Sequence, residues 1–294
     1  MGAEQHYNGI ESLDHPVIAA LDLDVARRTF ERLGFTVPPR GSHVEWGTGN
    51  LCIMFPDDYL EVRGIIDASR FTMDLDKHLD RFGEGLMGMA FGTSDIEHSH
   101  AEAVRNGIQA GRLRHLTRNF EHAGRWTQPA FDLFAPSAAD ADGLMHVVVL
   151  EHLTPELLRR PEFLVHANGC TGIDRVAGVI FDIERASGKL RRLLGDTAVT
   201  EHPQGVDVRL PGGQTIELLQ SAAYATKYGN IPALPEPDCP RLGAVRLAVE
   251  NTAVVAAVLS GNKVPFSRPA RNRIRVAPEH ACGVTLEFAE AGSE

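Results

Sequence analysis

A short pattern recurs four times in this chain of 294 residues: an apolar strand, an amphipathic helix, then short strands that end around a glutamate. These endings are residues 59–62, 149–152, 215–218 and 285–288. A strand-helix-strand-strand-strand unit cannot bury its apolar face alone, so copies of it must pair. Pairing of curved sheets leaves a cavity. Inward carboxylates in such a cavity suggest a metal.

The first unit shows the pattern most clearly. Its opening strand leads into a helix that Asp22 or Asp24 can cap, because a carboxylate there accepts the free N–H groups of the first turn. A Leu-Gly-Phe turn supplies a glycine stop. The spacing predicts that Val25, Phe30 and Leu33 form the buried stripe of this helix.

The later units begin near Leu86, Val176 and Leu242, and Asp95 and Asp182 are the expected helix caps of the second and third. Alternating strands and helices would also suit a doubly wound parallel sheet. Three of the four units, however, place several short strands after one helix, which favours an α+β fold. We therefore expect four βαβββ modules, paired into two curved and incomplete barrels.

Two halves are expected, with one pair of modules in residues 1–155 and the other in residues 156–294. A segment rich in proline, residues 231–240, is interpreted as a linker or crossover. The N-terminal pair is the expected site of function, and the C-terminal pair is expected to be degenerate.

Charge and cysteine content narrow the classes of partner. With 29 Lys and Arg against 39 Asp and Glu, the net charge of -10 disfavours binding to nucleic acid or to an anionic membrane. The four cysteines form no Cys-x-x-Cys pair, and no apolar run approaches the roughly 20 residues that cross a bilayer. We expect a cytoplasmic protein with reduced thiols and a small-molecule substrate, able to form a homodimer.

Several motifs resemble the glyoxalase-like branch of the vicinal oxygen chelate superfamily, which includes glyoxalase I, extradiol dioxygenases, fosfomycin-resistance enzymes and bleomycin-binding proteins. They are Asp14-His15-Pro16-Val17, Leu33-Gly34-Phe35, His43-x-x-Trp46-Gly47-Thr48-x-Asn50 and Tyr59-Leu60-Glu61, with further similarity at Thr154-Pro155-Glu156 and His166-x-Asn168-Gly169. The first unit matches well, and the last two match only in outline.

The resemblance implies a divalent metal held by His15 on the first strand and Glu61 on the last strand of the first module. Imidazole and carboxylate suit Fe, Mn, Ni or Zn. The positions equivalent to His15 in the later units are Gly88, Arg175 and Gly243, which are not ligands of this type.

A third ligand must therefore come from elsewhere. His43 is the preferred candidate, and Glu151 or His146 are the alternatives. Residues 146 and 151 differ by an odd number, so both cannot face inward on one regular strand. Glu151 is preferred of these two by analogy with Glu61.

Other side chains of the motifs are candidates for contact with a bound molecule. Trp46, Thr48 and Asn50 alternate along one expected strand and would share a face. They are the expected substrate-binding residues.

Tyr59 is a candidate proton donor, Glu151 is a candidate base if it is not a ligand, and His166 is a third catalytic candidate. Glu217 and Glu287 are expected to bond to neighbouring arginines or backbone instead.

Three functions follow from the resemblance. The leading one is a metal-dependent lyase or isomerase that chelates adjacent oxygens of a small substrate. The second is an extradiol-type ring-cleavage dioxygenase with Fe(II). The third is a metal-free binding or resistance protein.

Overall fold

The first sheet is formed by the N-terminal half of the chain. The computed structural model describes residues 7–137, 140, 147–229 and 240–290. The strands of this sheet are β1 (Ser12–Ala19), β2 (Gly41–His43), β3 (Thr48–Met54), β4 (Tyr59–Ile65), β5 (Gly85–Gly92), β6 (Arg114–His122), β7 (Arg125–Thr127), β8 (Ala130–Phe134) and β9 (Val147–His152). Its helices are α1 (Leu23–Arg32), α2 (Leu75–Phe82) and α3 (Ile96–Arg105). Because β2 pairs with both β3 and β6, every strand except β7 joins a closed barrel.

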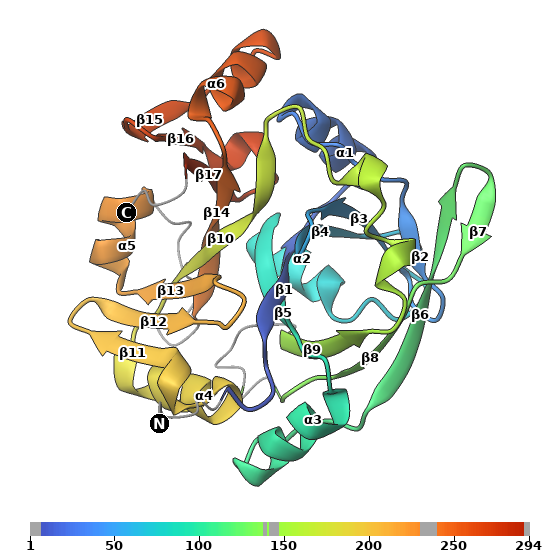
Figure 1. Ribbon diagram of the computed structural model, residues 1–294, viewed down its shortest axis with the longest axis vertical. Helices are drawn as coiled ribbons and strands as arrows, with labels where there is room; N and C mark the ends of the chain where they lie inside the picture. Colours follow the sequence, from blue (N-terminus) through green and yellow to red (C-terminus); the bar gives the residue numbers. More distant parts are fainter. Residues whose placement is uncertain (1–6, 138–139, 141–146, 230–239, 291–294) are drawn as a thin grey trace.

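The second sheet is curved and lies beside the barrel (Figure 1). Its strands are β10 (Cys170–Val179), β11 (Val199–His202), β12 (Gly205–Arg209), β13 (Thr215–Leu219), β14 (Arg241–Val249), β15 (Ser267–Ala270), β16 (Arg273–Val276) and β17 (Thr285–Glu290). Its helices are α4 (Ile183–Leu194), α5 (Ser221–Tyr228) and α6 (Thr252–Gly261). The strands follow the order β11-β12-β13-β10-β14-β17-β16-β15.

The structure confirms the α+β class and the two curved sheets, but the first barrel is closed rather than incomplete. Closure comes from β2, where Ser42 and His43 pair with Asn119 and Arg118 of β6. This pairing joins residues more than 70 positions apart in the chain, so local patterns did not reveal it.

The helix caps are largely as expected. Asp22 accepts the backbone N–H groups of Asp24 and Val25, and Asp95 and Asp182 cap α3 and α4 in the same way. The expected stripe of α1 is wrong at Val25, which is exposed, because Leu23 and Ala26 are buried in its place.

Two apolar clusters pack at the barrel besides the main core. In one, Leu75 of α2 packs against Val17, Ala19 and Met87. In the other, Leu158 and Phe163 from the segment after β9 join residues of β3, β4 and β6. The barrel also contains a cavity that is partly open to solvent.

The two sheets share one continuous core. Phe35, which follows α1, stacks on Phe288 of β17 with ring centroids 6.0 Å apart. The Asp58 carboxylate, in the β3–β4 turn, accepts the backbone N–H of Ile173 in β10 at 3.1 Å. The halves are therefore joined by apolar and polar contacts.

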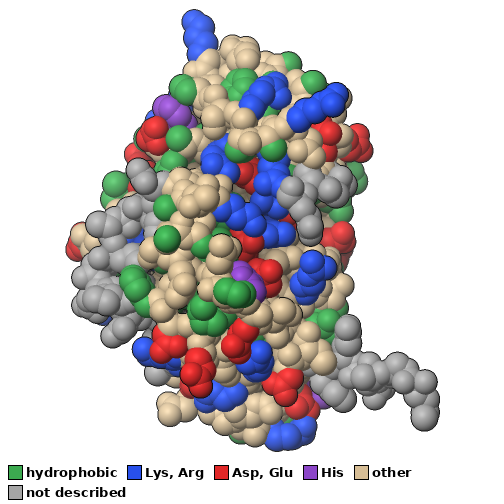
Figure 2. Space-filling view, turned by 90° about the vertical axis from the view of Figure 1, so that its left-hand side faces the viewer, with side chains coloured by type: hydrophobic (Ala, Val, Ile, Leu, Met, Phe, Trp, Pro, Cys, Tyr) green, Lys and Arg blue, Asp and Glu red, His purple; other side chains and the backbone are tan. Residues whose placement is uncertain are grey.

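The second sheet carries paired charges, as expected for its two glutamates. Glu287 accepts hydrogen bonds from Arg246 and Arg275, and Glu217 accepts them from Arg175, Lys227 and Tyr228. Figure 2, which views the side of this sheet, shows Lys and Arg side chains gathered beside carboxylates near its middle.

Other sequence expectations concern cysteines and membranes. Cys52, Cys170 and Cys282 are buried free thiols, whereas Cys239, His146 and most of the proline-rich segment lie outside the described residues. Among the helices that the structure describes, none has the length and apolar character needed to span a bilayer.

Candidate active site in the closed barrel

The cavity of the first barrel has one polar wall and one apolar wall. It is partly open to solvent and has a volume of about 70 Å³, enough for roughly five water molecules or a few heavy atoms of a ligand. The polar wall comes from β1 to β4 and β6, and the apolar wall comes from β6, β8 and β9. The lining side chains are His15, Val17, His43, Trp46, Asn50, Tyr59, Glu61, Arg63, Met73, Leu116, Arg118, Phe131, Leu133, Val148 and Leu150.

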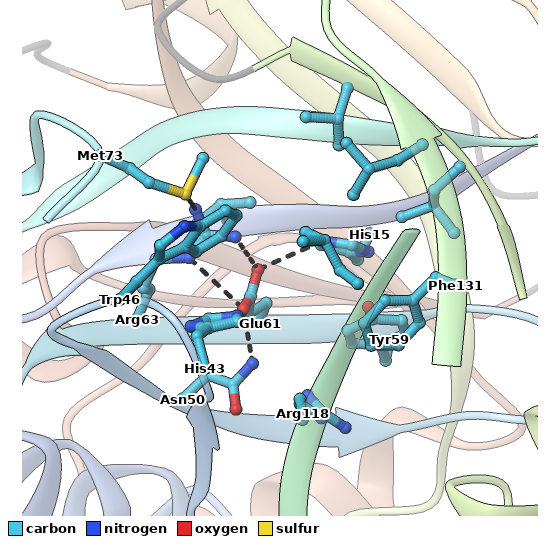
Figure 3. Close-up of a pocket in the computed structure, with 15 residues that line it drawn as sticks. His15, His43, Trp46, Asn50, Tyr59, Glu61, Arg63, Met73, Arg118 and Phe131 are labelled. Carbon is cyan, nitrogen blue, oxygen red and sulfur yellow. Dashed lines mark hydrogen bonds and ion pairs between the residues drawn. The ribbon is translucent and has the colours of Figure 1, made fainter. Parts of the chain in front are cut away.

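His15 and Glu61 point at each other inside this cavity, as expected (Figure 3). Strands β1 and β4 run parallel with Val17 level with Glu61. His15 Nε2 lies 3.2 Å from Glu61 Oε2, and both side chains are buried. The strand pairing therefore produces a buried imidazole-carboxylate pair.

The other ring nitrogen of His15 is held by Asp14. His15 Nδ1 lies 2.6 Å from Asp14 Oδ1. Neighbours on a regular strand point to opposite faces, but the β1–β5 register shifts between Leu13 and His15, and this bulge brings the two side chains together. Asp14 also bonds to His152 Nε2 at 3.0 Å and lies 3.7 Å from Arg159.

His15 is protonated more readily than an ordinary histidine. Burial alone would lower the pKa of His15, but the hydrogen bonds to Asp14 and Glu61 outweigh it and raise the pKa above its usual value of 6.5. The pKa of Asp14 is lowered despite burial, chiefly by His152 and His15. The two flanking carboxylates therefore favour the protonated form of His15.

Glu61 is bonded on both of its oxygens. Arg63 Nη2 donates to Oε2 at 2.6 Å, and Asn50 Nδ2 donates to Oε1 at 2.7 Å. Burial alone would raise the pKa of Glu61, but Arg63 and His15 hold it well below its usual range. Glu61 is the charged centre of the polar wall.

Tyr59 lies where the sequence placed it, on the same face of β4 as Glu61. Its ring stacks on the imidazole of His15, with centroids 4.2 Å apart and planes inclined by 25°. Burial raises the pKa of Tyr59 well above its usual value, so it stays a neutral phenol. Tyr59 fixes the plane of the His15 ring.

Arg118 is a buried cation on β6 that faces the same cavity. Nη1 of its guanidinium donates to Cys52 Sγ at 2.8 Å, and its Nε has no partner among the described residues. Burial raises the pKa of the Cys52 thiol to about 11, so that partner is uncharged.

The three expected substrate-binding residues do not share one strand. Thr48 and Asn50 are on β3, whereas Trp46 precedes it and reaches the cavity from the β2–β3 connection. Thr48 Oγ1 instead bonds to His43 Nδ1 at 2.8 Å and positions that ring. Burial and nearby Arg63 lower the pKa of His43 to about 4, so it is neutral.

Glu151 and His166 lie outside the cavity, contrary to their expected roles. Val148 and Leu150 face inward on β9, so the alternating Glu151 faces away, and its Oε2 accepts the N–H of Ile96 at the start of α3. His166 bonds through Nε2 to the Met54 carbonyl at 2.9 Å and accepts the Thr36 N–H on Nδ1 at 3.0 Å. Both side chains thus connect segments of the chain by hydrogen bonds and do not line the cavity.

The donor set does not fit the expected metal. The 3.2 Å between His15 Nε2 and Glu61 Oε2 suits two ligands of one ion, but Arg63 already occupies that oxygen. His43, the expected third ligand, bonds to Thr48, and no group of three His, Cys, Asp or Glu side chains in the described ranges could hold an ion. Two guanidiniums in the cavity oppose a cation further.

Four functional side chains were missed from the sequence: Asp14, Arg63, Arg118 and His152. Tyr59, Glu61 and Arg63 lie at every second position of β4. Strand alternation alone therefore predicts that Arg63 faces the same side as the other two. The bulge at Asp14 and the closure that brings in Arg118 have no comparable local signature.

Comparison with known proteins agrees with this architecture. The family described as "Glyoxalase-like domain" matches residues 13–194. No curated protein matches the sequence at a significant level.

Several solved structures are similar in fold. A hypothetical protein from Staphylococcus aureus has 11% identity and a TM-score of 0.68, covering 95% of this chain and 98% of that one. A 4-hydroxymandelate synthase variant from Streptomyces coelicolor has 13% identity and a TM-score of 0.63, covering 97% and 94%. A fusion of a xylose isomerase-like TIM barrel with 4-hydroxyphenylpyruvate dioxygenase has 13% identity and a TM-score of 0.59, covering 99% of this chain and 50% of that one. The family match spans most of the chain, which therefore belongs to the family described as "Glyoxalase-like domain".

Proposed function

We propose that this chain is a lyase or isomerase that moves a proton on a small oxygenated molecule held in the first barrel. The observation that carries this proposal is the buried pair of His15 and Glu61, 3.2 Å apart, with Asp14 on the other ring nitrogen. A histidine oriented by a carboxylate is a common acid-base unit in enzymes.

In the proposed step, His15 is the general acid. Its Nε2 proton goes to a carbonyl oxygen of the substrate while the Glu61 carboxylate takes a proton from the adjacent carbon, which gives an enediol or enol. Protonated Glu61 then returns its proton to the former carbonyl carbon of the enediol, while neutral His15 takes the proton of the neighbouring hydroxyl group. This gives the isomer and restores both side chains to their starting states.

The two groups support each other during this transfer. Arg63 and the positive charge of His15 together hold the pKa of Glu61 low. Loss of the His15 proton removes one of these two influences, so Glu61 becomes a stronger base as His15 gives up its proton. Asp14 stabilises the protonated ring and fixes its orientation. Tyr59 holds the ring plane.

The apolar wall supports the same chemistry. Phe131, Leu133 and Val148 line the cavity with side chains that form no hydrogen bonds, so they do not compete with the substrate for the proton of His15.

Deuterium exchange tests the proposal. We expect the purified protein to catalyse exchange of solvent deuterium into the position next to the carbonyl of at least one of dihydroxyacetone, hydroxyacetone and pyruvate. Proton NMR measures this exchange. His15→Gln should lose the exchange by a factor of about 10² or more, while His98→Gln, at an exposed position on α3, should keep it. Tight binding of a panel member without exchange would instead favour a metal-free binding protein.

A further inference from the structure

We propose that Arg118 binds a carboxylate group of the small molecule that occupies the barrel cavity. This inference rests on the proposed function in placing the substrate in that cavity, and it adds the substrate class: a short monocarboxylate.

The first argument is that Arg118 is a buried charge with no carboxylate in hydrogen-bond or salt-bridge contact among the described residues. Its side chain is only 3% exposed. Within the part of the chain that the structure describes, the one hydrogen bond of its guanidinium goes to the thiol of Cys52, which carries no charge. Buried guanidiniums are normally paired with an anion, because desolvating an unpaired charge is costly.

The second argument is that the carboxylates at the cavity are already engaged by other cations. Glu61 is bonded to Arg63 and faces His15. Asp14 is bonded to His15 and His152. Among the described residues, neither of these carboxylates forms a hydrogen bond or an ion pair with Arg118.

The third argument concerns the geometry of the wall. Arg118 lies on β6 where the barrel closes, paired with His43 of β2, and its backbone N–H bonds to the Pro129 carbonyl. A guanidinium on a strand held from both sides is a preorganised partner for a planar carboxylate. In Figure 3 it lies on the same wall as Tyr59 and Glu61, and no dashed line joins it to another drawn residue.

The inner part of the cavity suits the carboxylate end of a small ligand. Its volume of about 70 Å³ takes a few heavy atoms. Leu116, Phe131 and Leu133 also line the cavity and suit a short carbon chain. A molecule with one carboxylate and one neighbouring carbonyl or hydroxyl group would meet Arg118 and His15 together.

Matched ligands test the inference by isothermal titration calorimetry. The probes are acetate, pyruvate and lactate, each against its neutral amide, with inorganic phosphate as a separate anion. We expect at least one carboxylate to bind at least tenfold more tightly than its amide. Arg118→Met should weaken that binding at least tenfold, and Arg118→Lys should weaken it less. Arg114→Met, at an exposed position on the same strand, should bind as the wild type does.

Four outcomes would overturn the inference once thermal unfolding shows that the variants are folded. The first two are equal binding of the acids and their amides, and no binding of any of these acids. The other two are binding that Arg118→Met leaves unchanged, and binding of phosphate alone.

His15→Gln separates the inference from the proposed function. If carboxylates bind in an Arg118-dependent way, but the wild type exchanges deuterium into none of the probes, only the proposed function fails. If exchange depends on His15 but shows no preference for acids over amides, only the inference fails.

Discussion

Nε2 of His15 lies 3.2 Å from Oε2 of Glu61, on two adjacent strands that run parallel. With Asp14 on Nδ1, the imidazole stands between two buried carboxylates. The pKa of His15 is therefore raised in the folded protein. The stabilisation from protonated His15 is complete below about pH 6.5, its unfolded pKa, and is lost as the pH rises through the folded pKa.

Divalent metal ions should neither bind to the protein nor change its melting temperature. Arg63 is hydrogen-bonded to Glu61, and Thr48 is hydrogen-bonded to His43. We therefore expect elemental analysis after dialysis to find no stoichiometric Fe(II), Mn(II), Ni(II) or Zn(II). The melting temperature should not respond to a chelator. One ion per chain that is lost in Glu61→Gln, but kept in His98→Gln, would contradict the fit described above.

Arg118→Met should stabilise the ligand-free protein. Removing an unpaired buried charge while keeping side-chain volume is expected to raise the free energy of unfolding by about 1–3 kcal/mol, measured by urea denaturation. Arg114→Met on the same strand should change it by less than about 0.5 kcal/mol. A loss of stability in Arg118→Met beyond that of its control would mean that Arg118 supports the barrel itself.

Gly47→Ala should destabilise the rim of the cavity. A Cβ at Gly47 would lie 2.0 Å from the Asp67 carbonyl oxygen, and the backbone N–H of Gly47 bonds to Phe71. We expect a loss of about 1–3 kcal/mol in the free energy of unfolding. In Gly188→Ala, in α4, the new Cβ would contact no other atom. This change should instead raise the free energy of unfolding by about 0.5–1 kcal/mol. Equal effects of the two changes would refute this steric account.

Asp58→Asn should stabilise the contact between the halves at alkaline pH. Burial raises the pKa of Asp58 to about 7, above its unfolded value of about 3.9. The ionised carboxylate thus lowers stability above pH 7, and this loss disappears as the pH falls toward 4. We expect a gain of roughly 2–4 kcal/mol near pH 8, shrinking to nothing near pH 4.

Thermal unfolding across that pH range checks this expectation. Asp57→Asn, at the exposed neighbouring position, should show a much smaller trend, because the charge of Asp57 adds less than burial does to the raised pKa of Asp58. A gain for Asp58→Asn that is independent of pH would contradict the assignment.

Local signals in the sequence predicted much of the fold. Asp22, Asp95 and Asp182 cap helices as expected, because a cap depends only on the next few residues. Barrel closure through β2 and β6 could not be predicted, since it depends on pairing between distant segments. The stripe of α1 was misplaced because Val25 fits the helical period but lies on the solvent side.

The candidate site was predicted in part. His15 and Glu61 were found through repetition and family resemblance, and the structure brings them together. Asp14 was missed because strand alternation puts it on the face opposite His15, and only the bulge reverses this. Glu151 was chosen by analogy, but the inward face of β9 carries Val148 and Leu150.

The most direct test of the account is an NMR pH titration of the His15 ring in the wild type and in Glu61→Gln. The account predicts a pKa above 6.5 in the wild type and a lower pKa in Glu61→Gln, because one of the two flanking carboxylates is removed. A wild-type pKa at or below 6.5 that does not respond to Glu61→Gln would contradict the acid-base pair at the centre of this site.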